Sequence, residues 1–296
     1  MDRVKRFLAH GGKASVICAE TTELVEETRK IHDLTPTTTA AMGRFVTICG
    51  MMGLTDTKED DNKITAQIEG RGPVGSLVCS VRREKNVSKV KAYIENPYVE
   101  LPIREDGKLD VGGAVGNNGY LNVVKKNILT DSDYSGLVPL TSGEIAEDFA
   151  RYFVESEQKP TVLALGVLVD QNGTKASGGY MINLMPDATE EVIVAIENAI
   201  KGIPNISNLI AEGKSLEEIA KMVTGDENAE EIKEDISIIY ECDCSREKFE
   251  AGLISIGKEE LEKIYNTDKK AEIVCHFCNK KYDFTEEDLK KLIDSI

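Results

Sequence analysis

The sequence predicts an α+β protein whose cysteine-rich C-terminal part forms a small domain. Between residues 1 and about 184, stretches with the apolar patterning of strands outnumber those with helical periodicity. Turn signals such as Gly112-Gly113 are scattered, which favours an α+β layer over a regular βαβ repeat. Four of the seven cysteines lie near the C-terminal end. We therefore expect an α+β core domain (residues 1–184), a helical acidic linker (185–235) and a C-terminal domain (236–296).

Alternating or continuous runs of apolar residues predict the strands of the core domain. Helical periodicity predicts three helices. The last of them opens at Thr141, three residues before Glu144, a spacing typical of an N-terminal capping box. The expected strands cover residues 14–19, 63–69, 74–82, 88–94, 161–169 and 179–184, and the expected helices cover 21–31, 37–53 and 142–156.

Residues 185–235 differ in character from the core domain. A helix over about 190–200 is apolar on more than one face, and Ser215 with Glu218 forms a capping box for another short helix. Acidic residues outnumber basic ones by ten to three over residues 212–241. Short apolar helices beside a self-repelling acidic stretch indicate a marginally stable linker. An ordinary helical hairpin with a solvated acidic face fits the composition equally well.

The C-terminal domain is predicted to begin with a strand and to continue with short helices around its cysteines. Ser245 and Thr285 each precede a helical pattern, and both are residue types that cap helix N-termini. The expected elements are a strand over 236–240, helices from 245 to about 255 and over about 258–265, and a closing amphipathic helix after Thr285, while residues 271–274 lead into Cys275.

The balance of charges limits the classes of partner. The chain of 296 residues has 36 basic and 52 acidic residues, a net charge of −16. A protein that binds duplex nucleic acid needs a basic face, and an anionic membrane would repel this chain. The first ten residues do not resemble an export signal, and no apolar run approaches the roughly 20 residues that span a bilayer. We expect a cytoplasmic protein with no nucleic-acid or membrane partner, in a compartment that keeps thiols reduced.

Motifs of conventional catalysis do not occur in the sequence. The segment Gly70-Arg-Gly72-Pro-Val-Gly75 matches G-x-G-x-x-G, but Pro73 leads into a strand where a dinucleotide site requires the start of a helix. We interpret it as a turn between strands. The histidines are His10, His32 and His276, and none belongs to a known catalytic motif. His32 is expected at the surface or as a helix cap, His276 is not expected to bind metal, and we expect no enzymatic activity.

Paired cysteines are the most specific signal in the chain. Cys242 and Cys244 form a C-x-C pair, and Cys275 and Cys278 form a C-x-x-C pair after 30 intervening residues. Two such pairs separated by a loop are typical of a tetrahedral Zn²⁺ site with four thiolate ligands. Zinc binding contributes on the order of 10–16 kcal/mol in small structural sites, more than a core of this size supplies. We expect the C-terminal domain to unfold when the metal is removed.

The C-x-C spacing affects what oxidation does at this site. Two residues apart in an extended chain, Cα atoms lie about 6.6–7.2 Å apart, whereas disulfides prefer about 4.4–6.8 Å. Cys242 and Cys244 therefore cannot form a disulfide without bending the strand and leaving the metal. Zinc-bound thiolates are targets for oxidants such as peroxide, so oxidation and metal loss become one event. The alternative is a permanent zinc ribbon, although ribbons usually use C-x-x-C twice.

The three remaining cysteines lie singly in apolar runs. We expect them to be small buried hydrophobic residues and not redox partners. They are Cys18, Cys49 and Cys79.

The chain resembles the family of redox-regulated 33 kDa heat-shock chaperones. The resemblance covers nearly the whole chain, and all four paired cysteines match the family's metal positions. The stretches that carry it are 32–44 (HDLTPTTTAAMGR), the 70–75 turn, 136–140 (GLVPL), 152–160 (YFVESEQKP) and 178–186 (GGYMINLMP).

This resemblance implies a cytosolic holdase that acts without nucleotide. In the reduced state, one zinc ion keeps the C-terminal redox-switch domain folded, the linker lies on the core, and activity is low. Oxidation closes the disulfides Cys242–Cys244 and Cys275–Cys278 and releases zinc. The C-terminal domain and linker then lose structure, exposed apolar surface captures unfolding client proteins, and the oxidised form is a homodimer.

Two other functions stay open at this point. A thiol–disulfide oxidoreductase would use Cys275 and Cys278 as its redox pair and would turn over a dithiol substrate without metal. A nucleic-acid-binding zinc module is disfavoured by the acidity of the chain.

Overall fold

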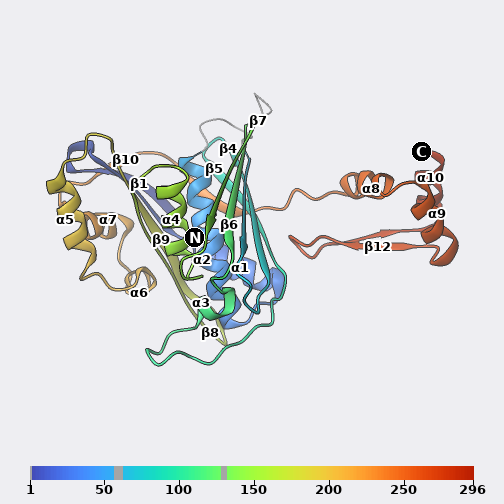
Figure 1. Cartoon of the computed structure of the whole chain (residues 1–296), viewed down its shortest axis with the longest axis horizontal. Helices are drawn as coiled ribbons and strands as arrows, with labels where there is room; N and C mark the ends of the chain where they lie inside the picture. Colours follow the sequence, from blue (N-terminus) through green and yellow to red (C-terminus); the bar gives the residue numbers. More distant parts are fainter. Residues whose placement is uncertain (1, 57–62, 128–131) are drawn as a thin grey trace. The chain divides into compact units, whose positions relative to one another are not determined.

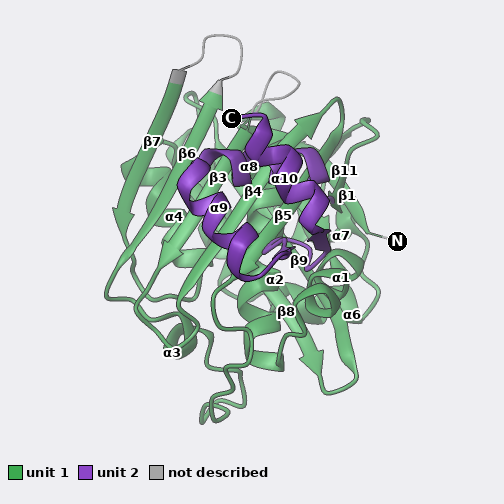
Figure 2. Ribbon diagram, turned by 90° about the vertical axis from the view of Figure 1, so that its right-hand side faces the viewer, with its two compact units in different colours: residues 1–240 green, residues 241–296 purple. Residues whose placement is uncertain are grey.

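The computed structural model describes residues 2–56, 63–127 and 132–296 of the chain. They form two compact units, Met1–Tyr240 and Glu241–Ile296, which Figure 2 distinguishes by colour. Each unit has a hydrophobic core of its own. Among the helices of the described residues, none combines the length and apolar character that crossing a membrane requires.

The larger unit is layered, with helix α2 (Pro36–Thr55) between two β-sheets (Figure 1). The five-stranded sheet has the order β10-β1-β2-β9-β8 and is antiparallel throughout. The six-stranded sheet has the order β11-β5-β4-β3-β6-β7, and only β11 runs parallel to its neighbour. The strands are β1 (Arg3–Ala9), β2 (Ala14–Glu20), β3 (Lys63–Glu69), β4 (Ser76–Glu84), β5 (Val87–Ile94), β6 (Tyr120–Asn127), β7 (Ser132–Pro139), β8 (Thr161–Asp170), β9 (Gly173–Leu184), β10 (Glu230–Ile232) and β11 (Ser237–Tyr240).

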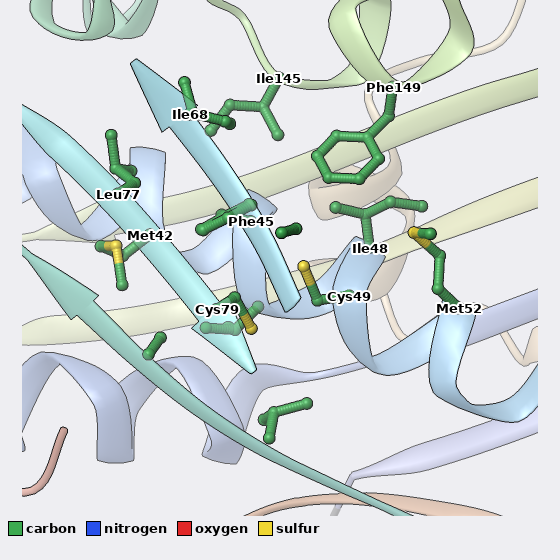
Figure 3. Close-up of a cluster of buried hydrophobic side chains, with 14 of the residues drawn as sticks. Met42, Phe45, Ile48, Cys49, Met52, Ile68, Leu77, Cys79, Ile145 and Phe149 are labelled. Carbon is green, nitrogen blue, oxygen red and sulfur yellow. The ribbon is translucent and has the colours of Figure 1, made fainter. Parts of the chain in front are cut away.

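Helix α2 is almost wholly buried because strands of both sheets pack against it. Apart from Arg44, its residues are apolar or small on every side, the pattern of a buried helix. Small residues let the strands approach: a Cβ atom on Gly50 would lie 2.5 Å from Cγ2 of Ile238 in β11. Figure 3 shows the cluster around this helix, where the rings of Phe45 and Phe149 lie 6.1 Å apart between centroids.

Most of the predicted elements of this unit are confirmed. Helix α1 (Thr22–His32) and helix α2 lie where the sequence places them, and the G-x-G-x-x-G segment is a turn between β3 and β4. The strand predicted at 179–184 is longer and begins at Gly173. Strands β1, β6 and β7 and the short helix α3 (Val111–Val115) were not predicted.

Helix α4 (Ala146–Glu155) begins four residues later than the sequence predicted, so the expected start at 142 is wrong. The backbone N–H groups of Thr141, Gly143 and Ile145 donate to the carboxylate of Asp148 at 2.7, 3.3 and 2.9 Å. Ile145 has a φ of 74°, so the chain wraps around this carboxylate before the helix starts. An acidic residue inside the first turn therefore accepts hydrogen bonds from the backbone N–H groups that precede the helix.

Residues 185–235 fold onto one face of the five-stranded sheet. They form α5 (Glu190–Ile200), α6 (Ile206–Ala211), α7 (Leu216–Thr224) and the edge strand β10, and Figure 1 shows the helices beside β1 and β9. The predicted capping box of α7 is confirmed. Together with the sheet, the helices form a second apolar cluster that includes Phe7, Val16, Ile182, Ile196, Leu209 and Ile219.

Strand β10 is the last strand of the five-stranded sheet on the β1 side. It pairs with three residues of β1. Lys5 Nζ lies 2.6 Å from a carboxylate oxygen of Glu231, and the His10 N–H donates to Asp226 at 2.6 Å. These contacts are partly exposed, and exposed ion pairs contribute little stability.

The smaller unit consists of three helices and a two-stranded hairpin. Ser245 and Thr285 cap their helices as predicted. The elements are α8 (Arg246–Ser255), α9 (Lys258–Thr267), β12 (Ala271–Val274), β13 (Lys281–Phe284) and α10 (Glu286–Asp294). The core is small, with six buried side chains apart from the cysteines: Leu253, Leu261, Tyr282, Phe284, Leu289 and Leu292.

Candidate metal centre

Two segments bring the four paired cysteines of the smaller unit together. Cys242 and Cys244 lie in the segment before α8, and Cys275 and Cys278 lie in the turn between β12 and β13. The turn is closed by the Asn279 N–H, which donates to the carbonyl of Cys275 at 2.8 Å. All four Sγ atoms lie within 4.8 Å of one another, close enough to bind one metal ion.

The distances between sulfur atoms suit a tetrahedral thiolate site. Metal–sulfur bonds of about 2.3 Å, as in zinc sites, place the sulfur atoms of a tetrahedron about 3.8 Å apart. Cys242 Sγ lies 3.7 Å from Cys275 Sγ, and Cys244 Sγ lies 3.4 Å from Cys278 Sγ. Four sulfur donors are the ligand set typical of structural Zn²⁺ and of iron–sulfur centres. The residues present therefore fit a four-sulfur metal centre.

Tyr282 and Lys248 hold the C-x-C segment in place. The hydroxyl of Tyr282, from β13, donates to the carbonyl of Cys244 at 3.1 Å and lies 3.2 Å from its Sγ. Lys248 Nζ donates to the carbonyl and the carboxylate of Asp243 at 2.7 and 2.6 Å. Contacts of this kind orient the residues that bind a metal. The sequence predicted neither, although an aromatic residue in the strand after Cys278 was an available signal.

Without a bound metal, the cysteines of this cluster differ in their pKa. Burial raises the pKa of Cys242 above its usual range. Burial acts in the same direction on Cys244, but hydrogen bonds from the Tyr282 hydroxyl and the neighbouring thiols outweigh it, so the pKa of Cys244 is lowered. Burial also raises the pKa of Cys278. A metal that requires thiolates must therefore displace protons from at least Cys242 and Cys278.

The histidines do not belong to this cluster. His276 is exposed and is not one of the four grouped residues. His32 is the last residue of α1, and only 6% of it is exposed, so its predicted place at the surface or as a cap is wrong. Its Nε2 atom lies 3.2 Å from the hydroxyl of Tyr240, the last residue of β11. A strand from a distant part of the sequence thus covers the end of the helix.

The three single cysteines are fully buried in the larger unit, as predicted. Figure 3 shows Cys49 of α2 and Cys79 of β4 among the apolar side chains of the core. Burial raises the pKa of both Cys18 and Cys49. These thiols therefore behave as small apolar side chains.

Known proteins similar to this chain match it over almost its whole length. The family described as Hsp33 protein matches residues 2–285. The chain is 43% identical over 295 residues to the 33 kDa chaperonin of Clostridium beijerinckii, covering 99% of both chains. It is 45% identical over 293 residues to the 33 kDa chaperonin of Clostridium botulinum, covering 99% of this chain and 97% of the relative.

A solved structure with a similar fold belongs to the same group of proteins. The crystal structure of the 33 kDa chaperonin of Thermotoga maritima, a heat shock protein 33 homologue, is similar with a TM-score of 0.88 and 34% identity, covering 99% of this chain and 97% of that one. Relatives with these names support a chaperone role for the protein. From its sequence and its fold, the chain belongs to the Hsp33 family.

Proposed function

We propose that this protein is a redox-regulated holdase chaperone that binds unfolding client proteins without ATP and prevents their aggregation. The observation that carries the proposal is the cluster of four sulfur atoms within 4.8 Å of one another, in a unit with a small core. Family membership supports the chaperone activity, and the sulfur cluster supports its control by oxidation. The protein is not an enzyme and turns over no substrate.

In the reduced state, Cys242, Cys244, Cys275 and Cys278 hold one Zn²⁺ ion as thiolates. The bound ion supplies folding free energy, on the order of 10–16 kcal/mol in small zinc sites. Burial of one apolar side chain contributes only about 1.5–3 kcal/mol, before the loss of conformational entropy is subtracted. Six such side chains do not hold residues 241–296, the smaller unit within the proposed C-terminal redox-switch domain (236–296), in their fold without the metal.

Oxidation removes the ligands themselves. The thiolates of Cys242 and Cys244 lose two electrons and form one disulfide, and those of Cys275 and Cys278 form a second. Formation of each disulfide transfers two electrons from a pair of thiolates to one molecule of hydrogen peroxide, which takes up two protons and gives two molecules of water. Because a disulfide sulfur carries no negative charge, it is a poor metal ligand, and Zn²⁺ is released.

Loss of the C-terminal fold releases the linker, residues 185–235, from the core domain, residues 1–184. In its docked form this segment buries apolar side chains of α5, α6 and α7 on the five-stranded sheet. Release exposes the apolar faces of the helices and of the sheet together, and client proteins bind there. The same exposed surface favours a homodimer of the oxidised form. We place this activity in the cytoplasm, with no nucleic-acid or membrane partner, in keeping with a net charge of −16.

The test follows metal release and client protection in one sample. Hydrogen peroxide is added to the reduced, zinc-loaded protein, released zinc is measured with an indicator dye, and light scattering of an unfolding client is recorded in parallel. We expect near-stoichiometric protection only after zinc has left. A Cys79→Ala variant is the control, because it removes a core thiol and leaves the sulfur cluster intact.

Two results would contradict the proposal. Equal protection of the client before any metal leaves would refute the switch. Turnover of a dithiol substrate by the metal-free protein would instead indicate a thiol–disulfide oxidoreductase that uses Cys275 and Cys278.

A further inference from the structure

Strand β11 is the last segment of the larger unit before the candidate metal centre. Its final residue, Tyr240, is two positions before Cys242 in the sequence. The strand lies within residues 236–296, the part of the chain that loses structure in the proposed function, yet it packs in the larger unit as an edge of the six-stranded sheet. Oxidation therefore removes a strand from this sheet as well as the linker from the other one.

The strand lies in a slot whose walls come from β5, α2 and α1. It pairs with β5 in parallel over four residues, from Ser237 opposite Val87 to Tyr240 opposite Val90. We call this place the β11 slot. All three walls belong to residues 1–184, the core domain that keeps its fold in the proposed function. The slot therefore persists, and opens, when β11 leaves.

One aliphatic side chain fits into the wall that α2 provides. Ile238 is 3% exposed and belongs to the core cluster around α2. A Cβ atom on Gly50 would lie 2.5 Å from Cγ2 and 3.0 Å from Cδ1 of Ile238, closer than carbon atoms pack, so the glycine makes room for this side chain. The next residue, Ile239, points to the opposite side of the strand and is 39% exposed.

A tyrosine hydroxyl is bound two residues further along. Side chains two positions apart in a strand lie on the same side, so Tyr240 follows Ile238 into the slot. Its hydroxyl accepts from the Ala92 N–H at 3.3 Å, donates to the Ala92 carbonyl at 3.2 Å and lies 3.2 Å from Nε2 of His32. Ala92 belongs to β5 and His32 to α1. When β11 leaves, these groups stay in the core domain with one partner fewer.

The segment seated in the slot shows which chemistry the slot accepts. Residues 236–240, Ile-Ser-Ile-Ile-Tyr, carry no charge and are rich in residues that favour strands. Buried strands of folded proteins have the same composition, and an unfolding protein exposes them. The protein's own strand is therefore similar in composition to the segments that an unfolding client offers.

We propose that the β11 slot is a binding site for unfolding client proteins, which the protein's own strand covers until oxidation. The site takes an extended client segment as a strand parallel to β5, with an aliphatic residue over Gly50 and a tyrosine two positions later. This inference rests on the proposed holdase function and adds a defined site, on the other sheet, to the apolar surfaces that linker release exposes.

The first test weakens β11 in the reduced, zinc-loaded, full-length protein. Ile238→Asp places a charge where the aliphatic side chain is buried, and Ile239→Asp is the matched control on the exposed side of the same strand. The probe is a fluorescein-labelled peptide with the sequence of residues 235–241, DISIIYE, titrated by fluorescence anisotropy. We expect it to bind Ile238→Asp at least about tenfold more tightly than Ile239→Asp, and to slow hydrogen exchange of β5 amides.

The second test uses the oxidised, unaltered protein and changes only the peptide. The tethered β11 competes with every peptide alike, so affinities are compared between peptides. A peptide that carries Ile238→Asp should bind at least about tenfold more weakly. One that carries Tyr240→Phe should bind about fivefold more weakly, and this loss should be smaller in a His32→Ala protein, which lacks one partner of the hydroxyl. Equal binding of the three peptides, or unchanged exchange in β5, would overturn the proposal.

Client aggregation separates this inference from the proposed function. An excess of the unaltered peptide should reduce client protection by the oxidised protein, and the Ile238→Asp peptide should not. If the peptide binds and protection is unchanged, clients do not use the slot, and the holdase function stands without it. Dissociation of an oxidised dimer by the peptide, with protection unchanged, would also overturn the proposal, because the slot then holds β11 of a second copy. If the oxidised protein protects no client even without peptide, the holdase function itself is wrong.

Discussion

A mutation in the small core of the C-terminal unit tests whether that unit folds only with its metal. Leu289 of α10 is fully buried in a cluster with Leu261 and Phe284, and it is not one of the four sulfur residues. Leu289→Ala removes three carbon atoms from this cluster. Such substitutions lower the free energy of unfolding by about 2–5 kcal/mol. We take about 3 kcal/mol, because a core of six side chains has few neighbours that can move into the cavity.

The loss of stability becomes a loss of metal affinity if folding and binding are coupled. When the metal-free unit is unfolded, the free energy of folding is part of the apparent free energy of binding. Since about 1.4 kcal/mol corresponds to a factor of ten, a loss of about 3 kcal/mol weakens zinc binding by about 140-fold. If the metal-free unit were already folded, the same mutation would leave the affinity almost unchanged.

The affinity is measured by competition with a chelator of known zinc affinity, on the reduced full-length protein. Ile256→Ala is the matched control, because this residue lies between α8 and α9 of the same unit and is 46% exposed. We expect it to change the affinity by less than about threefold. An equally small change for Leu289→Ala would refute the reasoning. Dispersed amide signals of the C-terminal unit after zinc removal would also refute it.

Three further predictions concern the larger unit. Asp148→Ala leaves the N–H donors before α4 without their acceptor, and we expect about 2–4 kcal/mol lower stability in thermal unfolding; an unchanged midpoint would contradict this. Hydrogen bonds from Arg29 lower the pKa of Glu26 from 4.5 to about 2. The folded pKa is below the unfolded one, so this stabilisation is complete above about pH 4.5 and is lost as the pH falls towards 2. In Glu26→Gln, the free energy of unfolding should therefore depend less steeply on pH between about 4.5 and 2. The same dependence on pH in the variant and the unaltered protein would exclude the effect. Tyr240→Phe removes a hydroxyl that donates to the carbonyl of Ala92 at 3.2 Å, so we expect about 1 kcal/mol lower stability and faster amide exchange in β11, whereas unchanged exchange would show that the bond contributes nothing.

Apolar patterning predicted the strands whose side chains alternate along the chain. In β3 every second residue is buried, and the sequence predicted this strand with the bounds that the structure has, Lys63–Glu69. In β1 the charged residues Arg3, Lys5 and Arg6 interrupt the apolar pattern, although Phe7 is fully buried. This strand is fixed by seven residue pairs with β2, and such pairing is not contained in a short stretch of sequence.

The cluster of sulfur residues could be predicted because cysteine spacing is read directly from the sequence. The contacts around it could not be, because they join residues distant along the chain. Tyr282 contacts Cys244, which is 38 positions away in the sequence, and Tyr240 contacts His32, which is 208 positions away. The same applies to residues 185–235: their composition fitted a weak linker or a helical hairpin, and their packing depends on the faces of β2 and β9.

The five-stranded sheet has an architecture that would let the core domain keep its fold if residues 185–235 left it, as we propose. Side chains alternate across the sheet: Ile17 and Met181 belong to the cluster around α2, whereas Val16 and Ile182 belong to the cluster with α5, α6 and α7. Removing these helices would therefore expose one face of the sheet to solvent and leave the other face packed against α2. Antiparallel sheets are stable with one face in solvent, but that face is normally polar. Here it would be apolar, and a folded sheet with an apolar face meets the physical requirement for a protein that binds unfolding chains without an energy source.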